Sequence, residues 1–169
     1  MAEKAITIYT PSNWAPHIFA EDDAQAFRAV FAGSGITDAD NRLAATVVSN
    51  NSVRLDSGLY SNMGYLLSIP AGKNHALTIG SGTAGMYRRD LIVAEFRRGG
   101  GATADTHEFK VVAGNQSPNI GSASRPSLTQ NNIATGGMLR QEALYEVLLN
   151  GTAISSVTRI ANYVGGFYA

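Results

Sequence analysis

Three glycines form the most specific chemical motif of the sequence. Gly80, Gly82 and Gly85 complete a G-x-G-x-x-G pattern after a short apolar run, which is the order found in dinucleotide-binding turns. Such a turn needs a helix that begins near its third glycine, because the pyrophosphate binds at the N-terminus of that helix. The positions three, four, seven and eight residues after Leu91 carry no apolar stripe, whereas residues 91–94 form a continuous apolar run typical of a buried strand. We therefore predict a glycine turn before a central strand, and no nucleotide or other cofactor.

Histidine and carboxylate side chains suggest metal binding as a second chemistry. His17, His75 and His107 are scattered along the chain, and none of them belongs to an H-E-x-x-H motif. Asp105 and Glu108 lie close to His107 in the sequence, but residues 107 and 108 of a strand point to opposite faces. We expect solvated hairpin residues here and predict no metal site.

Two groups of charged residues have structural interpretations. The acidic residues 21–23 stand at the start of a predicted helix, where acids favour the positive end of the helix dipole, so capping is preferred over cation binding. The arginine pairs at 88–89 and 97–98 bracket a predicted strand in a protein without net charge, and we expect them to solubilise the ends of that strand. The neutral charge balance predicts neither nucleic acid nor an anionic membrane as a partner.

Length and composition predict one domain. The chain has 169 residues, thirteen basic residues, thirteen acidic residues and no cysteine. A chain of this length buries about 70% of its unfolded surface, so a single domain over residues 1–169 can hold a core. The opening MAEKAITIYT is unlike a secretory signal, and no stretch reaches the roughly 20 apolar residues of a membrane span. We expect a soluble protein that is synthesised in the cytoplasm.

Apolar periodicity predicts a mainly-β fold, an antiparallel β-sandwich with one short N-terminal helix. The helix is expected over residues 22–32, with Asp22 as its cap and with Phe27 and Phe31 on one face before Gly33. Short β-branched runs between turn residues predict eight strands. These strands are expected at residues 44–49, 52–56, 65–69, 76–80, 90–96, 107–113, 144–149 and 153–160.

Turn residues predict how some of these strands connect. Asn50-Asn51 and Asn150-Gly151 are expected to form two-residue hairpin loops, because these residue types tolerate positive φ. Residues 115–137 are poor in large apolar side chains and contain two prolines. They predict a long loop or arm that lies across a neighbouring surface.

The order of four motifs resembles a known family. RRDLIVAEF, EFKVVAGNQSP, RPSLTQNN and ALYEVLLNGTAISSV follow one another as in tail and baseplate structural proteins of phages and prophages of Gram-positive bacteria. Members of that family also show a DDAQAFRAVFAGSG-like helix and a NSVRLDSGLYSNMGYLLSIPAG-like segment. The resemblance covers about residues 20–160. It implies a β-sandwich like the shoulder domain of trimeric receptor-binding tail proteins, and it implies no catalytic residues.

The resemblance implies a non-enzymatic virion component of the tail tip or baseplate. Such a protein is expected to form a homo-oligomer, a trimer, and to bind other tail proteins, with Arg89 and Asp90 as a structural motif of the central strand. Because no neck or head segment follows in this sequence, we expect an adaptor or assembly role more than host recognition. Deleting residues 163–169 is expected to weaken assembly. The expected contact residues are Phe27, Phe31, Tyr163, Phe167 and Tyr168.

Two other functions stay open at this point. A carbohydrate-binding module that contacts a saccharide of the host cell wall would share the fold, with Trp14, Tyr60 or Tyr65 stacked on sugar rings, although core or interface packing is the commoner role of such residues. An enzyme would need acid, base or metal groups that converge, and the sequence indicates no such set.

Overall fold

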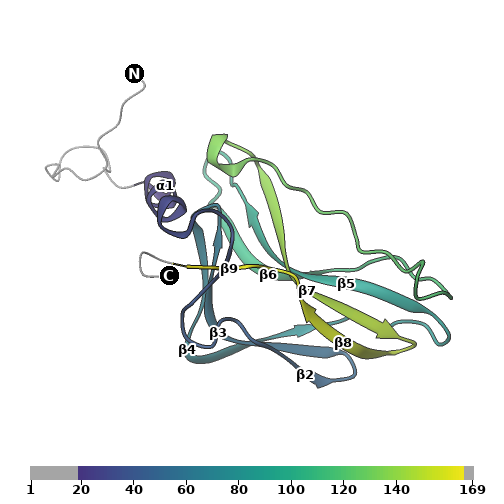
Figure 1. The fold of residues 1–169 in the computed structure, drawn as a ribbon. Coiled ribbons are helices and arrows are strands. Elements are labelled where there is room, and N and C mark those ends of the chain that lie inside the picture. The colour runs from purple at the N-terminus through teal and green to yellow at the C-terminus, as the bar shows by residue number, and fades with distance from the viewer. Residues whose placement is uncertain (1–18, 166–169) are drawn as a thin grey trace, which may run out of the picture.

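Two sheets pack face to face in the computed structural model of the chain, which describes residues 19–165 (Figure 1). The prediction of a mainly-β, sandwich-like fold with one short helix is confirmed for these residues. The five-stranded sheet A contains β1 (Gly35–Thr37), β2 (Ala45–Ser49), β3 (Ser52–Asn62), β4 (Tyr65–Thr78) and β9 (Tyr163–Val164). The four-stranded sheet B contains β5 (Tyr87–Arg97), β6 (Thr106–Val112), β7 (Leu139–Asn150) and β8 (Ala153–Arg159). Outside the sheets lie the helix α1 (Ala20–Phe31) and the 3-10 turn η1 (Ile133–Thr135).

Strand β3 is the centre of sheet A. It pairs with β4 along one side, and with β2 and then β1 along the other, all in antiparallel fashion. A bulge between Asp56 and Gly58 divides these pairings, and residues 70–73 of β4 have no partner in β3. The strands predicted at 65–69 and 76–80 are therefore two halves of β4. The prediction separated them because the unpaired stretch contains a proline and a glycine, which indicate a turn when only the local sequence is read.

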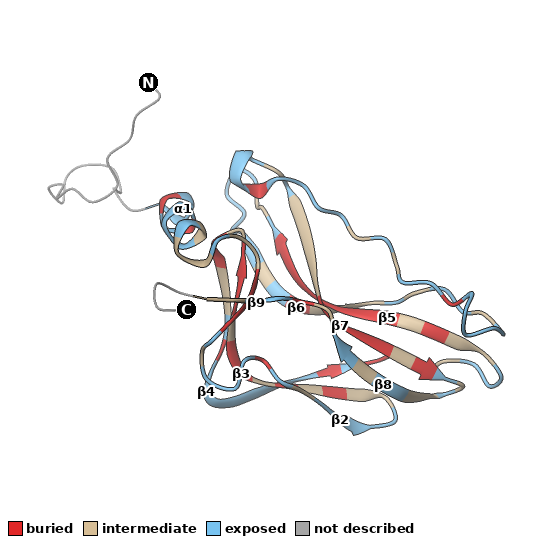
Figure 2. Cartoon of the chain, in the orientation of Figure 1, coloured by how far each residue is buried: buried red, intermediate tan, exposed pale blue. Residues whose placement is uncertain are grey.

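The segment after the glycine motif is the central strand of sheet B, as predicted. Strand β5 pairs with β6 on one side and with β7 on the other, and β8 completes the sheet. All residues from 90 to 96 are buried, so most of β5 is red in Figure 2. Ile92 and Ala94 belong to the core between the sheets. Leu91 and Val93 therefore point to the opposite, outer face of sheet B.

The main core joins the inner faces of the two sheets. Each fully buried Ile, Leu, Val or Phe side chain in it contributes about 1.5–3 kcal/mol relative to an exposed position. A smaller cluster at one end of the sandwich joins Ala24 of α1 to Tyr65, Phe96 and Ile133. The main core includes Ile36, Leu43, Val53, Leu55, Tyr60, Ile92, Leu144, Tyr145, Val147 and Leu149.

Helix α1 begins two residues earlier than predicted. Its cap is Phe19, whose backbone carbonyl accepts hydrogen bonds from the N–H groups of Asp22 and Asp23, so the prediction of Asp22 as the cap is wrong. The helix ends at Phe31, and its C-cap Ala32 adopts the left-handed conformation one residue before Gly33. Among the described residues no helix is long and apolar enough to cross a membrane.

The turn between β3 and β4 receives the helix at very close range. A Cβ atom at Gly64 would lie 1.8 Å from the carbonyl oxygen of Ala24, so only glycine permits this approach. Asp22 and Ala24 are the buried residues of α1, and most of the helix is pale blue in Figure 2. The helix thus covers one end of the sandwich and exposes most of its own surface.

Both predicted hairpins are present, one of them shifted. Residues 50–51 form the loop between β2 and β3, as predicted. Strands β7 and β8 still pair at Asn150, so the second loop consists of residues 151–152 and begins one residue later than predicted. The two hairpin tips are joined, because the backbone N–H of Ile154 donates to the carbonyl of Asn50 over 2.9 Å.

The predicted arm at residues 115–137 lies on sheet B of its own chain. It pairs with the start of β5 through a bridge between Tyr87 and Ser117, and through a bridge between Gln130 and Arg140 with the first part of β7, which β8 does not reach. Between these bridges it contacts side chains of the outer face of sheet B. In Figure 1 it is the green segment that runs beside β5 and β7. Leu91 and Val93, which point to this outer face, are therefore covered by their own chain.

Candidate functional site

Arg98 connects the separate segments at the helical end of the sandwich. It follows β5, and its guanidinium forms an ion pair with Glu21 of α1 over 2.9 Å. The same group donates to the hydroxyl of Tyr65 on β4 over 3.2 Å and to the backbone carbonyl of Ile133 in η1 over 2.8 Å. The hydrogen bond to Tyr65 is the largest of the effects that raise the pKa of Arg98. Arg98 thus holds helix, arm and both sheets together, and its role is structural.

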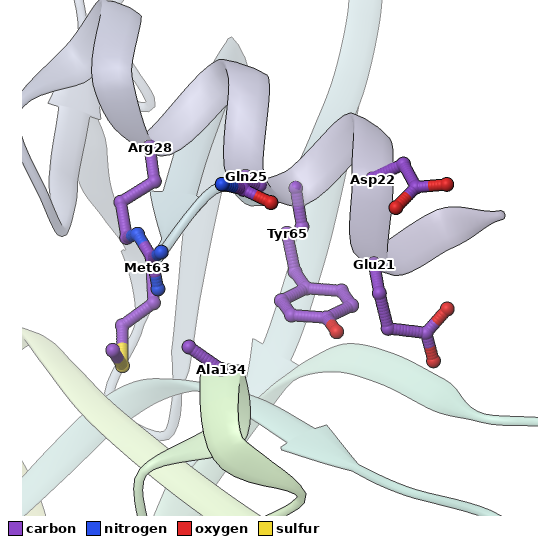
Figure 3. A pocket seen from close by; sticks show the side chains of 8 residues that line it. Glu21, Asp22, Gln25, Arg28, Met63, Tyr65 and Ala134 are labelled. Carbon is purple, nitrogen blue, oxygen red and sulfur yellow. The ribbon is translucent and has the colours of Figure 1, made fainter. Parts of the chain in front are cut away.

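A small polar hollow lies beside this arginine (Figure 3). Arg28 and Met63 lie at one side of it, Glu21 and Asp22 lie at the other, and the ring of Tyr65 lies between them. Its volume of about 120 Å³ has room for a few water molecules. The hollow is therefore too small for an organic substrate, and its charged groups are suited to binding water.

A larger groove also borders α1, and we call it the His107 groove. Its volume is about 280 Å³, just below the range of about 300–1,000 Å³ that is common for drug-sized ligands. Apolar side chains from the helix and from both sheets form most of its walls. The groove is lined by Ala20, Asp23, Ala24, Phe27, Gly64, Tyr65, Leu66, Phe96, Asp105 and His107.

His107 is packed between the sheets, contrary to the expectation of a solvated hairpin residue. Burial lowers the pKa of His107 to about 4, and the hydrogen bond to the backbone of Leu66 raises it by less. The His107 ring meets the Phe96 ring edge to face, with centroids 5.7 Å apart. Its Nε2 atom is buried and has no hydrogen-bond partner within residues 19–165. At neutral pH this histidine is therefore uncharged and acts as part of the packing.

The three suspected metal ligands do not converge, although Asp105 and His107 both line the His107 groove. Asp105 accepts a hydrogen bond from the backbone N–H of Gly99 over 2.8 Å, and Glu108 forms an ion pair with Lys110 over 2.9 Å. Within residues 19–165 no group of three or more histidine or carboxylate side chains lies close enough to hold a metal ion. Asp105 and Glu108 are therefore used in contacts within the chain.

The three glycines of the motif form the loop between β4 and β5. A Cβ atom at Gly82 would lie 2.2 Å from the carbonyl oxygen of Gly151, and Gly85 has a φ of 77°. The chain continues from this loop into β5, so no helix N-terminus faces the glycines. The predicted turn is confirmed, and close contact with the β7–β8 hairpin explains why glycine is needed there.

Arg89 and Asp90 both lie in the central strand β5, but on opposite faces. Asp90 is fully buried on the inner face, where it pairs with Arg88 over 2.7 Å and accepts a hydrogen bond from the backbone N–H of Gly114 over 2.9 Å. Arg88 also donates to two backbone carbonyls of the glycine loop. Arg89 pairs with Glu146 on the outer face over 2.5 Å. The expectation that these arginines only solubilise strand ends is wrong for Arg88, which is buried.

A polar network fixes the arm to the outer face of sheet B. Glu146 of β7 accepts hydrogen bonds from Arg89 and from Arg125 of the arm, each over 2.5 Å. Burial alone would raise the pKa of Glu146, but the hydrogen bonds and charges of Arg125 and Arg89 outweigh burial and lower it. Arg89 also donates to the carbonyl of Ala123 over 3.1 Å. The sequence indicated an arm but gave no sign of Glu146, which lies more than 20 residues from its arm partner.

The expected contact residues are only partly placed. Phe27 and Phe31 stack on α1 with ring centroids 6.4 Å apart, and Phe27 is 39% exposed. Tyr163 is 48% exposed on β9, and the guanidinium of Arg159 lies 4.0 Å from its ring centroid. Four other residues that the sequence singled out lie outside the described residues, namely Trp14, His17, Phe167 and Tyr168.

The edge strand β2 was not recognised as a contact surface from the sequence. It pairs only with β3 within sheet A, and its residues 45–49 carry neither charge nor proline. Val47 is 45% exposed and Val48 is 58% exposed. Natural edge strands usually carry a charge, a proline or a cover that prevents pairing with other chains. The run AATVVS was read only as a strand, because an edge position cannot be seen in local sequence.

Comparisons with known proteins gave no match to this chain. No protein-family model, no curated protein and no solved structure matched.

Proposed function

We propose that the chain is a non-enzymatic structural protein of a phage or prophage tail tip or baseplate. In this proposal it resides in the virion, assembles with copies of itself as a trimer and binds other tail proteins. The order of its sequence motifs supports the family, and the mainly-β sandwich is the fold expected of that family. Its mechanism is surface complementarity, with no chemical step.

The unprotected edge of β2 is the observation that carries the assembly role. Backbone N–H and C=O groups on this side of β2 face no further strand of sheet A, and two valines beside them are exposed. A neighbouring subunit can use such an edge by adding backbone hydrogen bonds and by covering the valines. In a trimer each copy would place this edge against a different surface of the next copy, because cyclic threefold contacts are heterologous.

The test is the molar mass of the purified protein in solution, measured by light scattering. The wild type is expected to show three times the 17.8 kDa of one chain, whereas Val48→Lys is expected to lower the mass to that of one chain. Lysine on an edge strand opposes pairing, because a charge would be buried in the contact. Thr158→Lys, on the exposed surface of the edge strand β8, is the matched control and should keep the wild-type mass.

A wild-type protein that is a single chain at all concentrations would contradict the self-assembly part of the proposal. An oligomer that Val48→Lys leaves intact would show that β2 is not the contact. Deletion of residues 166–169 is a cleaner test of the C-terminal residues than deletion of 163–169, because β9 also completes the sheet beside Ile36. Loss of mass in that shorter variant would assign a contact to the C-terminal residues.

Aromatic stacking gives the carbohydrate-binding alternative little support in this structure. Tyr60 and Tyr65 are 2% and 8% exposed, so neither ring offers an open face to a sugar. The ring of Tyr163 is exposed but lies beside Arg42 and Arg159.

A further inference from the structure

The apolar face of α1 is only partly used by the packing against the sandwich. Ala20, Ala24 and Phe27 follow one another at the spacing of one helical face, and all three line the His107 groove. Ala24 is buried against the turn at Gly64, whereas Phe27 is 39% exposed. The groove therefore continues the contact between helix and sheets and leaves room there for a further apolar group.

The groove combines apolar walls with hydrogen-bond acceptors. Leu66 of β4 and Phe96 of β5 contribute walls from the two sheets. Asp23 and Asp105 also line the groove, and a carboxylate accepts hydrogen bonds but cannot donate them. His107 is uncharged at neutral pH and adds no positive charge to its wall. The group that fits these walls is an apolar ring with a hydrogen-bond donor at its edge.

The sequence carries such a ring a short distance before the groove. Residues 1–18 precede the described part of the chain, and α1 begins at Ala20, which belongs to the groove wall. Trp14 is the one tryptophan of the sequence, and its indole joins a large apolar ring to a single N–H donor. Trp14 lies six residues before Ala20, and six extended residues span at most about 20 Å. This length allows the chain to turn back and place the indole in the groove.

Charge favours the same contact. Residues 4–18 contain Lys4 and His17 but no acidic residue, whereas the first turn of α1 carries three acidic residues, at positions 21–23. Charges of opposite sign attract the two segments to each other. A short covalent connection also gives a local concentration in about the millimolar range. A contact that is too weak to hold a separate molecule can therefore be occupied within one chain.

We propose that Trp14 occupies the His107 groove of its own chain, with its ring against Phe27 and Leu66 and its N–H donating to one of the two carboxylates. The volume of about 280 Å³ lies below that of most sites for drug-sized ligands, so it suits one aromatic side chain. The contact is independent of the proposed assembly role, since the groove shares no residue with β2. It would fix residues 14–19 beside α1 and cover the exposed face of Phe27.

The test uses the fluorescence and the nuclear magnetic resonance spectrum of the full chain, because a single tryptophan makes both signals specific. Trp14 is expected to emit at shorter wavelengths, and to be quenched less by acrylamide, than in the chain unfolded in urea. Nuclear Overhauser effects are expected between the indole protons and the methyl groups of Leu66. Dilution should leave the emission unchanged, because the contact lies within one chain. Emission that moves to longer wavelengths on dilution would assign the indole to the groove of a second copy and overturn the proposal.

Phe27→Asp is expected to shift the emission of Trp14 to that of the unfolded chain and to abolish the effects at Leu66, because the ring would cover a charge. Phe27 is partly exposed, so the fold should be kept, and circular dichroism checks this. Ala26→Asp is the matched control, since it adds the same charge at an exposed position of α1 outside the groove and should emit like the wild type. The proposal is overturned if the wild-type indole shows no Overhauser effect at Leu66, or if Phe27→Asp and Ala26→Asp give the same emission. Wild-type emission equal to that of the unfolded chain would also overturn it, and would leave the groove to a side chain of another protein.

Discussion

The outer face of sheet B is covered by its own chain, whereas the edge strand β2 of sheet A exposes apolar side chains. The arm and its polar network cover the outer face of sheet B, and residues 90–96 of β5 are buried throughout. In sheet A the edge strand β2 leaves Val47 45% and Val48 58% exposed. The outer face of sheet B is thus covered within the chain. In our proposal the exposed edge of sheet A at β2 is covered by another subunit.

Two ion pairs with the same spacing make this difference measurable. Arg88 and Asp90 lie two residues apart on the central strand of sheet B, and Arg54 and Asp56 lie two residues apart on the central strand of sheet A. The side chains of the first pair are 9% and 0% exposed, whereas those of the second are 40% and 29% exposed. The two pairs have the same spacing in the sequence but differ in burial. We therefore expect them to contribute unequally to the free energy of unfolding, because burial decides how much an ion pair contributes.

Asp90→Ala is expected to have the largest effect on stability. It leaves the buried guanidinium of Arg88 without its carboxylate and the N–H of Gly114 without its acceptor. Loss of one partner of a buried pair lowers the free energy of unfolding by about 3–5 kcal/mol. Urea unfolding followed by circular dichroism measures the change. A loss below about 1 kcal/mol would mean that sheet B is less closed at this point than the burial indicates.

Acid is expected to have the next largest effect, through His107 at the seam between the sheets. Its pKa is lowered to about 4 in the fold, so between pH 6.5 and 4 the unfolded chain binds a proton that the folded chain does not. The free energy of unfolding should therefore fall as pH decreases through this window, by up to about 3 kcal/mol from this residue. Urea unfolding at several pH values is the measurement. In His107→Leu the free energy of unfolding should no longer show this part of its dependence on pH. His75→Leu, at an exposed position of β4, should show the same dependence as the wild type.

Glu146→Gln is expected to loosen the arm from sheet B. The neutral amide cannot form the two charge-assisted hydrogen bonds that Arg89 and Arg125 make with the carboxylate. We expect the free energy of unfolding to fall by about 1–2 kcal/mol. Hydrogen exchange should become faster in residues 117–131 of the variant than in the wild type, whereas exchange in β5 should stay unchanged. Mass spectrometry of exchanged peptides measures both regions. Equal protection of the arm in variant and wild type would show that the bridges at its two ends hold it without Glu146.

Asp56→Ala is expected to have the smallest effect and serves as the control for Asp90→Ala. Its partner Arg54 is partly exposed, so solvent replaces the lost contact and the free energy of unfolding should change by less than about 1 kcal/mol. The same urea titration applies. A loss as large as that of Asp90→Ala would remove the distinction between the two sheets.

The sequence predicted where strands and turns lie along the chain better than it predicted which strands lie side by side. The run LIVA identified the buried strand β5, and the asparagine pair at 50–51 identified a hairpin, because both signals are local. The ion pairing of Arg88 with Asp90 and the position of β2 at an edge were missed, because they depend on which strands lie side by side. For the same reason the sequence did not indicate the pocket lined by Tyr60, Gln130 and Glu142, since its walls come from five separate segments. The strands β1 and β9 were missed because three and two residues are too short for a periodic signal.

The parallel pairing of β1 with β9 has a consequence for the order of events during synthesis. Ile36 lies opposite Tyr163, so the two partners are separated by most of the chain. Residues near the N-terminus leave the ribosome first, and a contact of such high sequence separation can form only after the last partner has emerged. Until then one side of β1 has unpaired backbone groups, and in the nascent chain this side of the strand is open to pairing with wrong partners.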